Sequence, residues 1–137
     1  MSNDLTPEVV DRLSTAKYGW LTTVAKSGQP VPKLVWFYFD GAALFVYSEP
    51  TAAKVRHVKA HPLVSLNLDS DGNGGGIIVI GGEVTNAAEG ADCRTDEPYW
   101  AKYGETSDKF GLTETMAKFS TRLRIAIDKV WLTPTEG

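Results

Sequence analysis

Residues 31–48 read VPKLVWFYFDGAALFVYS, and this stretch decides the fold. β-Branched and aromatic residues dominate it, and the Asp40-Gly41 pair in its middle favours a tight turn between two strands. The sequence therefore predicts an antiparallel hairpin with strands over residues 31–39 and 43–48. A strand with one face in water alternates apolar and polar residues, but the first of these strands is apolar on both faces except for Lys33. Both of its faces must therefore be covered.

The two faces of this first strand need different neighbours. The face with Val35 and Phe37 can fill the interior of a barrel. The face with Leu34, Trp36 and Tyr38 needs a helix, a ligand or a second subunit over it, because so large an aromatic patch is rarely left in water. We expect a homodimer whose interface includes Trp36 or Tyr38.

Four more strands are predicted on either side of the hairpin. Segments rich in β-branched and aromatic residues place them at 18–25, 63–69, 77–85 and 121–132. Helices are predicted at 6–17 and 49–60, and two short ones at about 98–103 and 113–119. The strands do not alternate with helices as they would in a parallel sheet. The sequence therefore predicts one domain over residues 1–137, mainly β with short helices, built on a six-stranded antiparallel barrel.

Charge and cysteine content narrow the class of protein. The formal net charge is -3, whereas nucleic-acid-binding proteins usually carry a basic surplus. The sequence has no apolar run long enough to cross a membrane. Cys93 is the only cysteine and cannot form an internal disulfide, which favours a reducing compartment, and residues 1–13 do not have the pattern of a signal peptide. We therefore expect a cytoplasmic protein with no nucleic-acid or membrane partner.

The segment SEPTAAKVRHVKAHP, residues 48–62, contains a candidate anion site. Ser48 and Thr51 stand at the entrance of the predicted helix, where unpaired backbone N–H groups and the helix dipole favour an anion. Lys54 follows on the same helix face as Thr51, and Arg56 is close by in sequence. Together these four residues could clamp a phosphate. The alternative is an ordinary solvated basic helix face, capped by Ser48 or Thr51.

Lys33 is the second candidate for a contact with an anion. It interrupts an apolar strand, and burial of an unpaired ammonium group is costly. Its side chain either reaches an anionic group of a ligand or extends to the rim of the barrel beside Pro32. A buried ion pair with Asp69 or Glu83 is a further alternative.

No catalytic or metal-binding set of side chains can be assigned. His57 and His61 lie four residues apart, but a metal site needs at least a third ligand, and no HExxH motif is present. No Ser–His–Asp set and no pair of carboxylates can be assembled. If the protein is an enzyme, a cofactor supplies the difficult chemistry.

The order and spacing of these motifs resemble a known family. The motif residues are Gly28, Pro30, Val35-Trp36-Phe37, Asp40-Gly41, Ser48, Thr51, Lys54, Arg56, Pro62, Val64-Ser65-Leu66 and Gly81-Gly82. The pattern is similar to that of the pyridoxamine 5′-phosphate oxidase-like proteins, which are FMN-binding split β-barrels. Within them it resembles the flavin/deazaflavin oxidoreductase B group, which uses coenzyme F420.

This resemblance implies a split β-barrel dimer with two cofactor sites at the subunit interface. It also implies that Ser48, Thr51, Lys54 and Arg56 hold the cofactor phosphate, and we expect Lys33 at the polar edge of the cofactor ring. The implied activity is hydride transfer from reduced F420 to a conjugated small-molecule acceptor. Two alternatives stay open: an FMN-dependent oxidoreductase on the same fold, and a non-catalytic protein that binds flavin, deazaflavin or haem.

Overall fold

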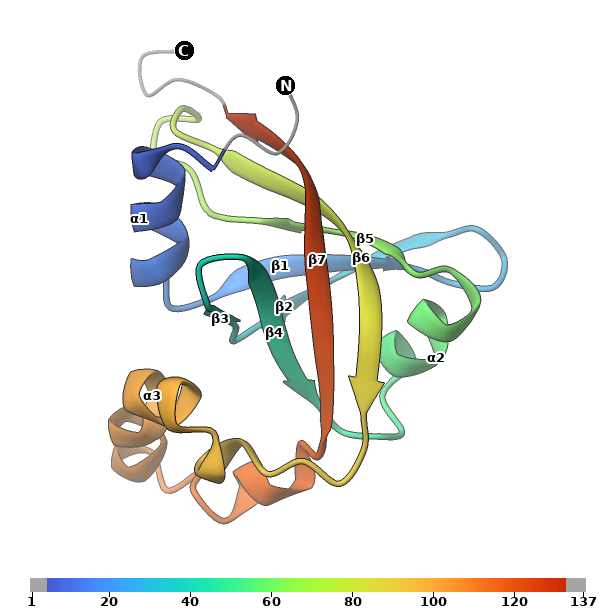
Figure 1. Cartoon of the computed structure of the whole chain (residues 1–137), viewed down its shortest axis with the longest axis vertical. Coiled ribbons are helices and arrows are strands. Elements are labelled where there is room, and N and C mark those ends of the chain that lie inside the picture. Colours follow the sequence, from blue (N-terminus) through green and yellow to red (C-terminus); the bar gives the residue numbers. More distant parts are fainter. Residues whose placement is uncertain (1–4, 133–137) are drawn as a thin grey trace.

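A computed structural model describes residues 5–132 of the chain. In this part of the chain a single antiparallel sheet of seven strands, in the order β2-β1-β5-β6-β7-β4-β3, curls into a half barrel (Figure 1). The strands are β1 (Gly19–Val24), β2 (Pro30–Val35), β3 (Tyr38–Phe39), β4 (Ala43–Ser48), β5 (Leu63–Asn67), β6 (Ile78–Ala88) and β7 (Thr121–Leu132). The α-helices are α1 (Pro7–Thr15), α2 (Ala53–Ala60) and α3 (Glu97–Lys109), and two 3-10 turns are η1 (Cys93–Thr95) and η2 (Thr115–Lys118).

The predicted strand over residues 31–39 is wrong, because the strand breaks at Trp36 and Phe37. The first part, β2, pairs with β1, whereas the second part, β3, pairs with β4. Two side chains of α3 form hydrogen bonds with the backbone of Phe37. The Phe37 N–H donates to Tyr103 Oη at 3.0 Å, and the Phe37 carbonyl accepts from Lys102 Nζ at 2.9 Å. The break turns the six expected strands into seven and places β2 and β3 at opposite edges of the sheet.

The first helix follows from local sequence. Thr6 caps α1, its hydroxyl accepting from the N–H of Val9 at 3.3 Å, and Pro7 occupies the first helical turn. Val9 and Leu13 are buried in the main core, which fills the half barrel. α1 was predicted from these residues, and the structure confirms it.

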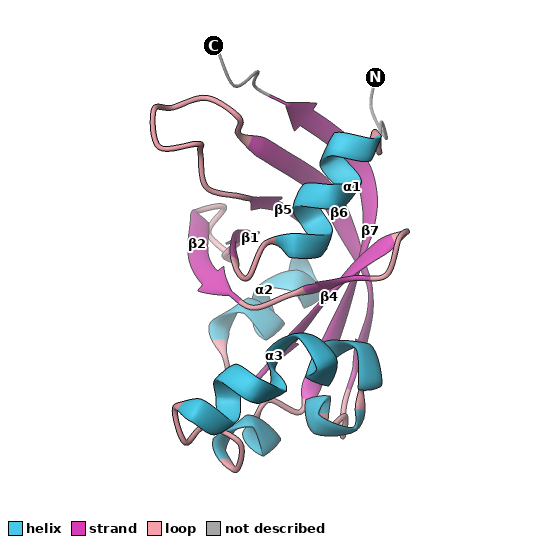
Figure 2. Ribbon diagram, turned by 90° about the vertical axis from the view of Figure 1, so that its left-hand side faces the viewer, coloured by secondary structure: helices cyan, strands magenta, loops and turns pink. Residues whose placement is uncertain are grey.

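Residues 89–120, between β6 and β7, form a helical insert at one end of the sheet (Figures 1 and 2). A second apolar cluster lies beneath the insert and contains Tyr47, Cys93, Tyr99, Tyr103 and Met116. Burial raises the pKa of the Cys93 thiol to about 11, so the thiol stays protonated and packs like an apolar side chain. Helices were expected in this region, but α3 extends beyond the predicted range.

A row of side chains crosses the outer face of the sheet. Leu34, Trp20, Asn67, Val79 and Trp131 are register neighbours across β2, β1, β5, β6 and β7. Leu34 is 52% exposed, Trp20 39% and Trp131 52%. The described part of the chain leaves a large part of each of these three apolar side chains exposed.

The aromatic face expected at the dimer interface is partly covered by the chain itself. Trp36 stacks on Tyr103 of α3, and Tyr38 packs beside Phe45. Both Trp36 and Tyr38 are half-buried. The row that contains Leu34, Trp20 and Trp131 is more exposed than this expected face.

No helix among the residues described is both long and apolar enough to cross a membrane.

Candidate functional site

Two of the residues predicted to bind an anion, Ser48 and Lys54, come together beside the start of α2. Ser48, the last residue of β4, is fully buried, and Lys54 Nζ lies 3.4 Å from its Oγ. Burial lowers the pKa of Lys54, the charge of Lys33 on β2 lowers it further, and Glu49 partly offsets both effects. The Lys54 ammonium group thus lies beside a buried hydroxyl, within electrostatic range of Lys33. Within residues 5–132, no carboxylate forms a salt bridge with either lysine.

The alternative for Lys33, an ion pair with Asp69 or Glu83, does not form among the described residues. Lys33 is exposed, and Asp69 Oδ2 instead accepts from the hydroxyl of Tyr18 at 2.9 Å. Since Lys33 perturbs the pKa of Lys54, its charge acts on the anion site.

Thr51 and Arg56 are exposed and lie beside each other. The Arg56 guanidinium donates to the backbone carbonyl of Thr51 at 2.9 Å, which holds it against the start of α2. The alternative, an ordinary cap by Ser48 or Thr51, is wrong: the N-cap residue is Ala52, and no side chain caps the helix. The first N–H groups of α2 are therefore left without a side-chain acceptor.

His57, one of the two histidines considered for a metal site, lies against β1. Its Nδ1 lies 2.8 Å from Thr23 Oγ1, so the ring fixes α2 to the sheet. No group of three or more His, Cys, Asp or Glu side chains is arranged to hold a metal in the described part of the chain.

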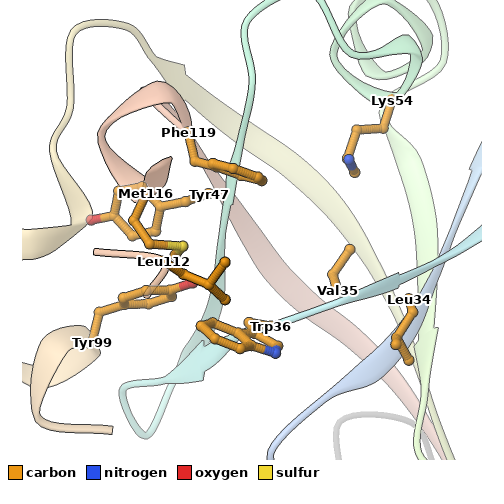
Figure 3. Close-up of a pocket in the computed structure, with 9 residues that line it drawn as sticks. All are labelled: Leu34, Val35, Trp36, Tyr47, Lys54, Tyr99, Leu112, Met116 and Phe119. Atoms are coloured by element: carbon orange, nitrogen blue, oxygen red, sulfur yellow. The ribbon is translucent and has the colours of Figure 1, made fainter. Parts of the chain in front are cut away.

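A pocket of about 240 Å³ opens next to the anion site (Figure 3). It lies between the barrel and the helical insert. Its lining comprises Leu34, Val35, Trp36, Tyr47, Lys54, Tyr99, Leu112, Met116 and Phe119. Lys54 belongs both to this pocket and to the contact with Ser48, so the charged site and the apolar pocket are continuous.

Aromatic rings form the inner walls of the pocket. Tyr99 packs edge-on against Tyr47, with ring centroids 4.7 Å apart, and Trp36 stacks on Tyr103 at 4.5 Å. Tyr47 donates its hydroxyl to Asp96, and burial raises the pKa of both Tyr47 and Tyr99. Both phenols stay neutral near pH 7. Flat, neutral walls suit a planar conjugated ring, and the ammonium group at the edge suits an anionic substituent of that ring.

Sequence reasoning missed the lining residues that the insert supplies. Tyr99, Leu112, Met116 and Phe119 lie in a segment that reads as polar on average, and only the tertiary fold brings them to β4. The available signal was the spacing of Tyr99 and Tyr103, which places two aromatic rings on one face of the predicted helix.

Comparison with known proteins identifies the family. The family model "Pyridoxamine 5'-phosphate oxidase" matches residues 5–134. The chain belongs to this family. The half barrel of antiparallel strands is the split-barrel fold of the pyridoxamine 5′-phosphate oxidase family, as the sequence motifs predicted. A search of curated proteins gave no match.

Several solved structures share the fold at low sequence identity. An F420 reductase is 22% identical, with a TM-score of 0.69 over 88% of this chain and 94% of that one. A FAD-binding protein from Mesorhizobium loti is 23% identical, with a TM-score of 0.64 over 90% of this chain and 87% of that one. The haem storage protein HutZ from Vibrio cholerae is 16% identical, with a TM-score of 0.62 over 94% of each chain. At these identities the likeness concerns the fold alone.

Proposed function

We propose that this protein is an F420-dependent oxidoreductase that transfers a hydride from the reduced deazaflavin to a conjugated small-molecule acceptor. The observation that carries the proposal is the position of Lys54, between the buried Ser48 hydroxyl and the aromatic pocket. An anion and a flat ring are the two parts of a phosphorylated flavin or deazaflavin. The split-barrel family and the F420 reductase of the same fold support this choice.

The anion site fits a phosphate on physical grounds. Lys54 is half-buried, and its pKa is lowered by burial and by Lys33. A phosphate would offset both effects, because it supplies the negative charge that the site lacks. We assign Lys54 and Ser48 to this phosphate, with Thr51 and Arg56 at the uncapped start of α2 as outer contacts and Lys33 acting through its charge.

When bound, the cofactor supplies the hydride chemistry. The residues of the chain orient the ring and exclude water from it. Trp36 and Tyr47 form parts of the pocket wall, and the insert covers the pocket with Leu112 and Phe119. Burial of the ring away from water strengthens every electrostatic contact made to it.

We further propose a homodimer that forms through the exposed row on the outer face of the sheet. Trp20, Leu34 and Trp131 expose apolar surface on this face, and an exposed apolar patch of this kind is typical of a protein–protein interface. Leu34 belongs to this row and also lines the pocket. A second copy on this face would therefore border the cofactor site.

A fluorescence titration tests the proposed cofactor. Purified protein is titrated with F420 and with FMN, each alone, and ligand emission is followed. Tighter binding of F420 supports the deazaflavin assignment, whereas tighter binding of FMN supports the flavin-dependent alternative. If neither cofactor binds at micromolar concentration, the proposed function is wrong.

A further inference from the structure

Tyr99 is held rigidly at the inner wall of the pocket. It lies on α3, is 1% exposed, and packs against Tyr47 at 4.7 Å and Tyr103 at 4.9 Å between ring centroids. Contacts on two sides leave its phenol little freedom to move. The direction of its hydroxyl is thus a fixed property of the pocket.

The hydroxyls of the neighbouring tyrosines have partners in the protein, but that of Tyr99 has none within residues 5–132. Tyr47 donates to Asp96, and the Tyr103 hydroxyl lies 2.7 Å from the carbonyl of Phe37. In Figure 3 the Tyr47 hydroxyl points out of the pocket, while that of Tyr99 is directed toward its middle. Among the described side chains, only Thr121 Oγ1 is both unpaired and completely buried. The Tyr99 hydroxyl is unpaired but is not completely buried, so it is open to the pocket that Tyr99 lines.

The chemistry of Tyr99 determines what it can bind. Burial raises the pKa of its phenol, which keeps the proton on the oxygen and makes the group a hydrogen-bond donor. Most of the surrounding lining is apolar or aromatic, and Lys54 supplies the ammonium donor on the β-barrel side. An unpaired donor within such a lining favours a ligand that presents a carbonyl oxygen at that point.

We infer that the pocket binds a planar conjugated ring and that the Tyr99 hydroxyl donates a hydrogen bond to a carbonyl oxygen of that ring. The carbonyl belongs either to the ring of the cofactor or to a conjugated acceptor substrate, and both present the same chemistry to Tyr99. The inference rests on the proposed function, in which Lys54 binds the cofactor phosphate. The contact with Tyr99 can nevertheless be tested with a ligand that has no phosphate.

Tyr99→Phe tests the contact, because it removes only the hydroxyl. Since no protein partner is lost, the melting temperature should stay the same or rise. The matched control is Tyr38→Phe, which also removes a hydroxyl without a protein partner within the described residues, but from a side chain that does not line this pocket. The probes are riboflavin, which has the ring without phosphate, FMN, and menadione, a conjugated quinone added in the presence of excess FMN.

If the cofactor ring supplies the carbonyl, Tyr99→Phe weakens the binding of riboflavin and of FMN by the same factor, about three- to tenfold. The carbonyl stretch of bound riboflavin should then move to higher frequency in the infrared spectrum. If the acceptor supplies it, only menadione binding weakens. Either result, with the affinities of the Tyr38→Phe control unchanged, supports the inference.

The inference is overturned if Tyr99→Phe and the parent bind all three probes with equal affinity. It is also overturned if the parent binds none of them. The proposed function fails in a different way. In that case Lys54→Ala does not change the preference for FMN over riboflavin, whatever the effect of Tyr99→Phe.

Discussion

Trp36 and Tyr103 lie face to face, with ring centroids 4.5 Å apart and planes inclined by 5°. The Tyr103 hydroxyl also forms hydrogen bonds with the backbone of Phe37, the residue that follows Trp36. Tyr103 therefore fixes both residues of the break between β2 and β3. Because Trp36 also lines the pocket, α3 determines where this wall of the pocket lies.

Tyr103→Phe should destabilise the protein by about 1–3 kcal/mol, since it leaves the buried N–H of Phe37 without its acceptor. Urea unfolding followed by circular dichroism measures the change. Tyr38→Phe is the control, because Tyr38 is half-buried and makes no side-chain hydrogen bond within the described residues. Equal stability of Tyr103→Phe and the parent would contradict the role assigned to this hydroxyl.

Lys54→Ala should weaken binding of F420 or FMN by roughly ten- to a hundredfold, because a charge-assisted contact to phosphate contributes about 1.5–3 kcal/mol. Stability should change little, since Lys54 makes no ion pair with the described residues. Lys59→Ala serves as the matched control, because Lys59 is an exposed lysine on the same helix. A similar loss of affinity in both variants would mean that the effect is one of net charge alone.

Lys33→Met should have a smaller effect, about two- to fivefold, because Lys33 is exposed and its charge is screened by solvent. The difference from the parent should vanish in about 0.5 M salt, where the screening length falls to a few ångströms. Isothermal titration with FMN at low and high salt measures this. A loss that persists at high salt would point to direct contact with the cofactor ring.

Lys102 should make stability depend on pH. Burial lowers its pKa to about 8, from 10.5 in the unfolded chain, so between these values the unfolded state binds the extra proton. Stability therefore rises as pH increases through this window, by on the order of 1 kcal/mol after discounting for the exposed part of the side chain. Urea unfolding of the parent and of Lys102→Met at pH 7.5, 9 and 10 tests it. Parallel curves for the two proteins would show that Lys102 does not titrate in this window.

Trp20→Glu should convert the proposed dimer to monomers, because it places a charge within the exposed row, next to Leu34. Sedimentation at micromolar concentration should give about twice the chain mass of 14.9 kDa for the parent and the chain mass for the variant. Phe110→Glu is the control, because Phe110 is 66% exposed at the end of α3 rather than on the sheet. A monomeric parent would rule out the dimer.

The predictable parts of the fold and of the site depend on residues close together in sequence. The turn at Asp40-Gly41 forms because Asp40 Oδ1 accepts from the N–H groups of Ala42 and Ala43, both at 2.8 Å, and because Gly41 adopts φ +99°. Ser48 and Lys54 are only six residues apart, so the strand-to-helix connection was enough to bring them together.

The parts that could not be predicted depend on contacts between distant residues. The break at Trp36 and Phe37 requires Tyr103, 66 residues further along the chain from Phe37. The pocket likewise requires Tyr99 and Met116 to reach β4, and no local pattern specifies that contact. Period-2 alternation detects a strand, but it does not detect where a side chain from elsewhere captures the backbone of that strand.

The two sides of the pocket come from separable pieces of the chain. The barrel supplies Lys54 and Trp36, while residues 89–120 supply Tyr99, Leu112 and Phe119 from one continuous excursion between β6 and β7. The lining residues of the insert can therefore diverge without disturbing the contact between Ser48 and Lys54, provided that Lys102 and Tyr103 keep their bonds to the backbone of Phe37. Relatives that differ in this insert can therefore keep the same anion site on the barrel while they differ in the ring that the pocket prefers.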